Sequence, residues 1–259
     1  MTPIYKNRCL FQCCIVLKMR NCLHIIHARK NDMEKIEDLV LIIVAAGSSV
    51  RFGGREKQLE LLGGLPVFLH SVKNLSPLAR ACIIAVPQGK IAHYKDVAVK
   101  YGFASNELHF VEGGSSRTAS VRNALAKAAS LLQDGIVAIH DAARPLASQE
   151  MLRCLVKTAR DFGGAAPGKK VSDTMLRTDE NDNIAEYIPR TGIWHVATPQ
   201  VFRLQELLNA YNAAKNLDFT DDTQVFLHNG GKVHMLQENA CNIKITYPDD
   251  LEQCRSLLT

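Results

Sequence analysis

The chain has 259 residues, of which 47% are hydrophobic and 22% are charged. These values are ordinary for a globular protein and exclude a disordered or fibrous chain, and the length fits one α/β domain or two small ones. No apolar run approaches the ~20 residues that a membrane-spanning helix needs, so we expect no membrane association.

The formal net charge of +5 originates at the start of the chain. Six basic residues precede the first acidic residue, Asp32, and the other 25 basic and 26 acidic residues leave a net charge of −1. A near-neutral body gives no reason to expect a nucleic-acid partner. We interpret residues 1–38 as an N-terminal extension, either disordered or lying before a true start at Met33, and residues 39–259 as the functional domain.

The number and positions of the cysteines indicate in which cellular compartment the protein works. Four of the eight cysteines lie in the extension, where their spacing fits no common zinc finger or ribbon. The other four are scattered through predicted strands and helices, as free thiols in a reducing compartment are. We therefore predict a cytoplasmic protein, with organellar targeting by the extension as the alternative that stays open.

From residue 39 the sequence alternates between apolar, β-branched runs and segments with helical periodicity. Such apolar runs are typical of strands buried on both faces of a parallel sheet. Strands that alternate with helices indicate βαβ units, so we predict an α/β fold with a doubly wound, mostly parallel, Rossmann-like sheet. In chain order the expected elements are a strand at 39–46, a helix near 66–75, strands at 81–87 and 107–114, a helix at 115–132, a strand at 135–145 and a helix at 149–162.

The segment 171–191 interrupts this alternation. Its two extended flanks surround the acidic, turn-rich stretch TDEND, which predicts a β-hairpin arm protruding from the sheet. An arm of this length needs a surface to lie on, so we expect a homodimer formed through the arm, with a mobile surface loop as the alternative. The arm is followed by the segment TPQVF at 198–202, after which we expect a helix near 203–215, a short strand at 232–236 and a terminal helix.

Three unusual segments, 45–58, 112–120 and 140–145, each follow a predicted strand. Because the carboxyl ends of parallel strands share one edge of a sheet, these segments should meet and form an active site. The first is neither a Walker loop nor a GxGxxG loop, but its glycines and its cations, among them Arg51 and Lys57, suit a polyphosphate. Such a loop can catalyse nucleotidyl transfer by positioning and charge neutralisation; a solvated basic loop is the alternative.

The third segment reads HDAARP. Its His-Asp pair is compatible with a general base or a metal site, and Arg144 is available to pair with Asp141. We favour a different role for His140, that of a core histidine at the end of a strand.

Seven motifs stand in the order found in the sugar-nucleotidyltransferase superfamily. They are AAG-x3-R-x5-KQ at 45–58, GG-x2-R-x2-SV at 113–121, HDAARP at 140–145, DT at 173–174, R-x3-WH-x2-TPQ at 190–200, TDD at 220–222 and NIKIT at 242–246. In detail the chain resembles the 2-C-methyl-D-erythritol 4-phosphate cytidylyltransferase family over about 39–258. The resemblance implies transfer of CMP from CTP to that polyol phosphate, with release of pyrophosphate. It also implies Mg²⁺ held mainly by the triphosphate, and no metal site on the protein itself.

The resemblance also implies the site residues. Arg51, Lys57, Arg190 and Lys244 would be catalytic, with Arg51 and Lys57 stabilising the charged α-phosphate. The arm would complete the site of the neighbouring subunit, and no general base is required because the attacking phosphate is already ionised. The substrate-binding residues that the resemblance implies are Ala45, Ala46, Gly47, Gly113, Arg117, Ser120, Asp141, Ala142, Thr174 and Thr220, with Arg117 in the cytidine pocket and Asp141 on the polyol hydroxyls.

Three residues depart from the family's pattern. Glu56 stands where proline is common and adds a negative charge beside the expected triphosphate site, Ser115 stands where an acid is common, and Cys241 replaces an aspartate. Two alternatives stay open: a cytidylyltransferase for another polyol phosphate such as ribitol 5-phosphate, and a catalytically silent nucleotide-binding homologue. The HDAARP and R-x3-WH-x2-TPQ segments favour methylerythritol phosphate, and the four cations argue against a silent homologue.

Overall fold

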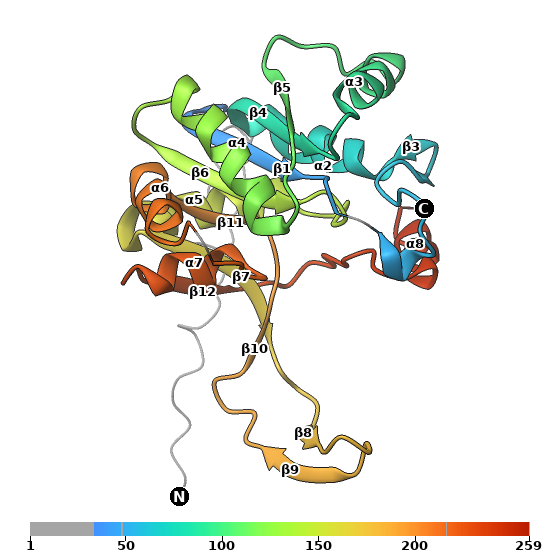
Figure 1. Cartoon of the computed structure of the whole chain (residues 1–259), viewed down its shortest axis with the longest axis vertical. Helices are drawn as coiled ribbons and strands as arrows, with labels where there is room; N and C mark the ends of the chain where they lie inside the picture. The colour runs from blue at the N-terminus through green and yellow to red at the C-terminus, as the bar shows by residue number, and fades with distance from the viewer. Residues whose placement is uncertain (1–33, 48, 216, 259) are drawn as a thin grey trace, which may run out of the picture. The chain divides into compact units, whose positions relative to one another are not determined.

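The computed structural model describes residues 34–47, 49–215 and 217–258. Ile36–Thr259 forms one compact unit, whose described residues are drawn in colour in Figure 1. The predicted extension 1–38 falls almost entirely outside the described residues. In the described part of the chain, no helix has the length and apolar character needed to cross a membrane.

An eight-stranded sheet organises this unit, in the order β10-β7-β11-β6-β1-β4-β5 with β12 paired to β7. Its parallel half contains β1 (Ile36–Val44), β4 (Ala79–Val86), β5 (Leu108–Glu112) and β6 (Ile136–Asp141). The chain moves from β1 through β4 to β5 and then returns to the other side of β1 as β6. This reversal is the switch point of a doubly wound sheet, where ligands bind beyond the strand ends. The predicted fold class is confirmed.

Helices cover both faces of the sheet because successive strand side chains point to opposite sides. Along β1, Leu41 and Ile43 join the core on one face, while Val40 and Ile42 join the core on the other. The first face is covered by α2 (Val67–Leu75), α3 (Ile91–Lys100) and α5 (Gln149–Phe162), and the second by α4 (Arg117–Leu131), α6 (Leu204–Ala213) and α7 (Asp222–His228) (Figure 1).

The sheet continues into a mixed half. There β11 (Gln200–Arg203) runs antiparallel between β6 and β7 (Gly164–Lys170), β12 (Val233–Gln237) runs parallel to β7, and β10 (Trp194–Val196) pairs with the end of β7. β7 is absent from the predicted strands because its sequence, GAAPGKK, is composed of residues that are rare in strand interiors. Its first five residues are nevertheless buried.

A small third core joins segments that are distant in sequence. It contains Phe52 from the short helix η1 (Val50–Phe52), Ile245, and residues of α8 (Pro248–Ser256). In chain order, the two short strands β2 (Leu61–Leu62) and β3 (Leu65–Pro66) lie between η1 and α2, and η2 (Ser76–Leu78) leads from α2 into β4. This core therefore fixes the loop after β1 against the segment that contains NIKIT.

The predicted arm is a two-stranded hairpin that extends away from the main sheet (Figure 1). Its strands β8 (Met175–Thr178) and β9 (Ile184–Ile188) pair antiparallel, and an ion pair of 2.8 Å joins Arg177 to Glu186 across them. The turn contains Asp182 with a φ of 63°. An isolated two-stranded hairpin is only marginally stable in water, so the arm needs support from another surface.

Candidate active site

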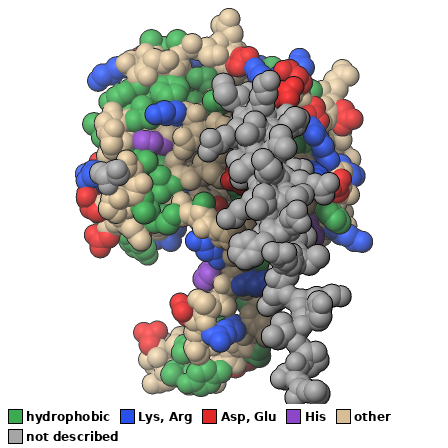
Figure 2. Space-filling view, turned by 180° about the vertical axis from the view of Figure 1, so that it is seen from behind, with side chains coloured by type: hydrophobic (Ala, Val, Ile, Leu, Met, Phe, Trp, Pro, Cys, Tyr) green, Lys and Arg blue, Asp and Glu red, His purple; other side chains and the backbone are tan. Residues whose placement is uncertain are grey.

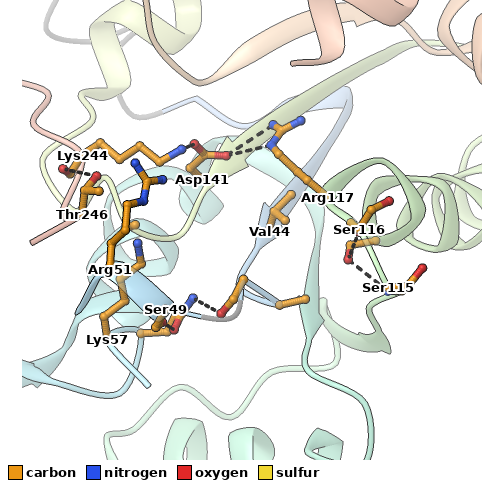
Figure 3. A pocket seen from close by; sticks show the side chains of 16 residues that line it. Val44, Ser49, Arg51, Lys57, Ser115, Ser116, Arg117, Asp141, Lys244 and Thr246 are labelled. Atoms are coloured by element: carbon orange, nitrogen blue, oxygen red, sulfur yellow. Dashed lines mark hydrogen bonds and ion pairs between the residues drawn. The ribbon is translucent and has the colours of Figure 1, made fainter. Parts of the chain in front are cut away.

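A pocket of about 410 Å³ opens beyond the carboxyl ends of β1 and β6, at the switch point of the sheet. In Figure 3, Arg51, Lys57 and Lys244 lie on one side of it and Arg117 on the other, with the carboxylate of Asp141 between them. The lining residues come from the loops after β1, β5 and β6 and from the NIKIT segment. The predicted meeting of the three strand-end loops is thus observed.

The loop after β1 is folded back on itself by its own side chains. The hydroxyl of Ser49 donates to Oε1 of Gln58 (3.2 Å), and Nε2 of Gln58 donates to the backbone oxygen of Gly47 (3.3 Å). Both side chains belong to buried residues. Closing the loop at its base in this way brings Arg51 and Lys57 to the same pocket.

Lys57 is held at the wall of the pocket. Its Nζ donates to the backbone oxygen of Ile245 (2.8 Å), which links the first loop to the NIKIT segment. Burial lowers the pKa of Lys57, and the nearby positive charges of Lys244 and Arg51 lower it further. Because these cations repel one another, an anion that enters the site relieves the repulsion and is bound favourably.

Glu56 does not face the pocket. Its Oε1 lies 3.1 Å from Nζ of Lys90, and the hydroxyl of Tyr94 donates to its Oε2 at 3.4 Å. The negative charge of Glu56, which was expected beside the triphosphate site, is therefore paired with the ammonium group of Lys90, just before α3. Lys57, the next residue, keeps its orientation into the pocket.

Asp141 ends β6 between two cations. Its Oδ2 accepts a hydrogen bond from Nζ of Lys244 (2.6 Å), and its Oδ1 accepts from Arg117 (3.3 Å). Burial alone would raise the pKa of Asp141, but the charges of Arg117 and Lys244 hold it well below its usual range. Arg144, considered above as a partner of Asp141, instead donates to the backbone oxygen of Asn242 (2.7 Å).

Asp222, the first residue of α7, is a site residue that was not predicted. Its carboxylate is fully buried, and it accepts hydrogen bonds from Nη2 of Arg117 (2.6 Å) and from the hydroxyl of Tyr211 (2.5 Å). Burial alone would lower the pKa of Arg117, but the charges of Asp222 and Asp141 raise it, so the guanidinium stays charged. The TDD motif could have indicated Asp222 in the sequence, since it places two acidic residues directly after the predicted site residue Thr220.

Comparison with known proteins identifies the family. The model of the family described as 2-C-methyl-D-erythritol 4-phosphate cytidylyltransferase matches residues 39–259. The chain belongs to this cytidylyltransferase family. The membership inferred from the seven motifs is therefore confirmed.

Individual relatives agree over most of the chain. A 2-C-methyl-D-erythritol 4-phosphate cytidylyltransferase from Porphyromonas gingivalis is 36% identical over 221 residues, covering 84% of this chain and 96% of the relative. One from Clostridium acetobutylicum is 35% identical over 223 residues, again covering 84% and 96%. The crystal structure of the enzyme from Thermus thermophilus superposes with a TM-score of 0.69 at 28% identity, covering 86% of this chain and 98% of that one.

Most of the predicted site residues of this cytidylyltransferase lie together. Ala45, Gly113 and Ala142 are buried and adjoin lining residues in the sequence, and their N–H groups donate to backbone oxygens of β4 and β1. A Cβ on Gly113 would lie 2.4 Å from Cβ of Ala46, so only glycine lets the loop after β5 approach the loop after β1 this closely. Those that line the pocket directly are Ala46, Gly47, Arg51, Lys57, Arg117, Ser120, Asp141 and Lys244.

Three predicted residues do not line the pocket of their own chain. Thr174 and Arg190 are exposed on the arm, where Arg190 donates to the backbone oxygen of Ser172. Thr220 is exposed, and its hydroxyl donates to Gln224 at 3.3 Å. Eight lining residues were not among the predicted site residues: Val44, Ser49, Gln58, Gly114, Ser115, Ser116, Ala143 and Thr246. Ser115 is also one of the departures from the family's pattern.

His140 is a core residue, the role favoured from its sequence. It is fully buried, its Nε2 lies 3.1 Å from the backbone oxygen of Arg144, and its Nδ1 lies 3.2 Å from the hydroxyl of Thr198. Burial lowers the pKa of His140 from 6.5 to about 4. The imidazole is therefore neutral at pH 7 and supports the HDAARP loop.

This lowered pKa predicts a loss of stability in mild acid. Between pH 6.5 and about 4 the unfolded chain binds a proton at His140 that the folded chain does not, so the free energy of unfolding falls as the pH falls. The loss from this residue amounts to at most about 3 kcal/mol. In chemical denaturation, wild type should lose stability faster than His140→Gln, which does not titrate. A constant difference between the two proteins over this range would contradict the assignment.

Proposed function

We propose that this cytidylyltransferase transfers the CMP group of CTP to 2-C-methyl-D-erythritol 4-phosphate in the pocket described above and releases pyrophosphate. Family membership supports the reaction. The observation that supports the location is the convergence of four cations around Asp141 at the switch point of the sheet. These cations are Arg51, Lys57, Arg117 and Lys244.

The chemistry follows from the charges. An oxygen of the polyol's phosphate forms a bond to the α-phosphorus of CTP, while the bond from that phosphorus to the pyrophosphate oxygen breaks. Both the attacking and leaving groups are anionic, so the site must mainly position them and neutralise charge. Arg51 and Lys57 stabilise the α-phosphate in the transition state, and Lys244 binds the attacking phosphate. The attacking oxygen is ionised at neutral pH, so no general base is needed.

We expect Mg²⁺ to enter on the triphosphate, whose negative charge it helps to neutralise. Among the described residues, no group of three His, Cys, Asp or Glu side chains could hold a metal ion. Asp141 is the one carboxylate among the residues that line the pocket, and Arg117 and Lys244 already pair with it. This donor set fits an ion whose ligands come mainly from the nucleotide.

We also infer a homodimer whose arms are exchanged. Leu176, Ile184 and Tyr187 are 40%, 58% and 66% exposed, and hydrophobic side chains gather at the end of the arm in Figure 2. Apolar side chains on a marginal hairpin favour burial against another molecule. A second copy of the chain satisfies this need and brings Thr174 and Arg190 to a pocket that otherwise lacks them.

We also propose that the protein is located in the cytoplasm. The four cysteines in the described residues, Cys82, Cys154, Cys241 and Cys254, are free thiols. Two of them are buried, which is usual for structural thiols in a reducing environment.

A pyrophosphate-release assay tests the reaction. With CTP as nucleotide, we expect turnover with 2-C-methyl-D-erythritol 4-phosphate to exceed turnover with ribitol 5-phosphate or sugar phosphates by at least about a hundredfold, because a pocket built to bind particular hydroxyls rejects substrates that leave its polar groups unpaired. Faster turnover with ribitol 5-phosphate would reassign the substrate. CTP binding without turnover of any acceptor would indicate a silent homologue.

A further inference from the structure

Asp222 is a buried carboxylate that does not line the pocket. Both of its oxygens are occupied, Oδ2 by Nη2 of Arg117 at 2.6 Å and Oδ1 by the hydroxyl of Tyr211 at 2.5 Å. A carboxylate removed from water is costly unless it is paired and hydrogen-bonded. Its partner, Arg117, lines the pocket, so the charge of Asp222 can affect the pocket through Arg117 although Asp222 itself does not line it.

Arg117 is shared unequally between two carboxylates. Its contact with Asp222 is short, whereas its Nε and Nη2 both lie 3.3 Å from Oδ1 of Asp141. Short charge-assisted hydrogen bonds are the stronger ones. Asp222 therefore holds the guanidinium, and Asp141 makes its short contact, 2.6 Å, with Lys244 on the other side.

Hydrogen bonds other than the Arg117–Asp222 pair also connect the start of α4, which carries Arg117, to the segment before α7, which carries Asp222. The hydroxyl of Thr118, in the first turn of α4, donates to the backbone oxygen of Phe219 and accepts from its N–H, both at 2.9 Å. The hydroxyl of Ser116 donates to Asp218 at 2.5 Å. The start of α4 is thus bound to the segment before α7, which keeps Asp222 in register with Arg117.

The charges show what the loss of Asp222 would do. Lys244, Asp141, Arg117 and Asp222 alternate in sign and sum to zero. Without the charge at position 222, the carboxylate still facing Arg117 is Asp141, and the guanidinium would move onto it. This movement would alter the pocket wall that Arg117 forms and would occupy the oxygen that Asp141 offers to substrate.

We infer that Asp222 is a positioning residue for the transfer reaction. It fixes Arg117 at the boundary between the nucleotide and polyol parts of the pocket and leaves Asp141 available to the hydroxyl groups of the polyol phosphate. The inference rests on the proposed function, which assigns the nucleotide to Arg117 and the polyol to Asp141.

Two matched variants test this role. Asp222→Asn removes the charge but keeps the size of the side chain, and Tyr211→Phe removes the other hydrogen bond to Asp222 but keeps its charge. For Asp222→Asn we expect kcat/KM for each substrate to fall about tenfold and the Kd for CTP alone to rise about tenfold, the effect of one misplaced charged hydrogen bond. For Tyr211→Phe we expect changes within about twofold, with a similar loss of thermal stability.

A double-mutant cycle shows whether Asp222 acts through Arg117. If it does, Arg117→Gln combined with Asp222→Asn should be no slower than Arg117→Gln alone, because the positioned group is already missing. Additive losses, or equal kinetic losses in Asp222→Asn and Tyr211→Phe, would assign Asp222 a purely structural role. Unchanged kinetics and CTP affinity in Asp222→Asn would overturn the inference while the function stands. Absence of wild-type turnover would overturn the proposed function and with it the role in transfer, whereas the CTP measurement, which needs no second substrate, would still report whether Asp222 positions Arg117.

Discussion

Replacing Lys57 by alanine should lower kcat by a factor of about 10²–10³ while changing the Kd for CTP by less than about threefold. The reason is that negative charge builds up at the α-phosphate during transfer, and Lys57 faces the pocket where that charge develops. Arg51 and Arg117 remain in the pocket to bind the nucleotide in its ground state. Pyrophosphate release measures kcat, and calorimetry with CTP alone measures Kd.

Lys57 also forms part of the pocket wall, so the loss of its side-chain bulk must be separated from the loss of its ammonium group. Lys57→Met keeps the length of the side chain and should be as slow as Lys57→Ala. Lys73→Ala, on the exposed side of α2, serves as the control and should match wild type. If Lys57→Met retained wild-type turnover, the charge of Lys57 would have no part in the reaction.

Lys57 was predictable because its position depends on chain topology. Buried strands are recognisable as apolar runs, and the carboxyl ends of parallel strands share one edge, which places Arg51, Lys57 and Asp141 together. Lys244 could be predicted as a site residue only from the family resemblance, because it lies on a segment without regular strand structure after β12. Its place in the pocket depends on the small core that surrounds Ile245.

Features that depend on contacts between distant elements were not predictable from local sequence. The direction of Glu56 is determined by Lys90 and Tyr94 of the α3 region, and the role of Asp222 by Arg117 and Tyr211. The strand β7 is a similar case, since burial between neighbouring strands and α5 outweighs the weak strand preference of its glycines and proline. By contrast, α5 begins and ends at the predicted residues, where a serine cap and a terminal glycine mark it.

Exchange of the arms predicts that two inactive variants restore activity when their subunits are mixed. Lys57→Ala and Arg190→Ala should each be nearly inactive as homodimers. In a mixed dimer one site combines both changes, while the other takes Lys57 from one chain and Arg190 from its partner, both intact. Random mixing makes half of the dimers mixed, so co-expression should restore about a quarter of wild-type activity.

The matched control uses two residues of the same pocket. Lys57 and Lys244 line one cavity within a single chain, so in a mixture of Lys57→Ala and Lys244→Ala every site of every dimer lacks one of them. This mixture should stay inactive, although its subunits exchange as freely as those of the first pair. Recovery in both mixtures, or in neither, would contradict arm exchange. Recovery in the first alone would place Arg190 in the partner's site, because Arg190 lies on the arm and does not line the pocket of its own chain.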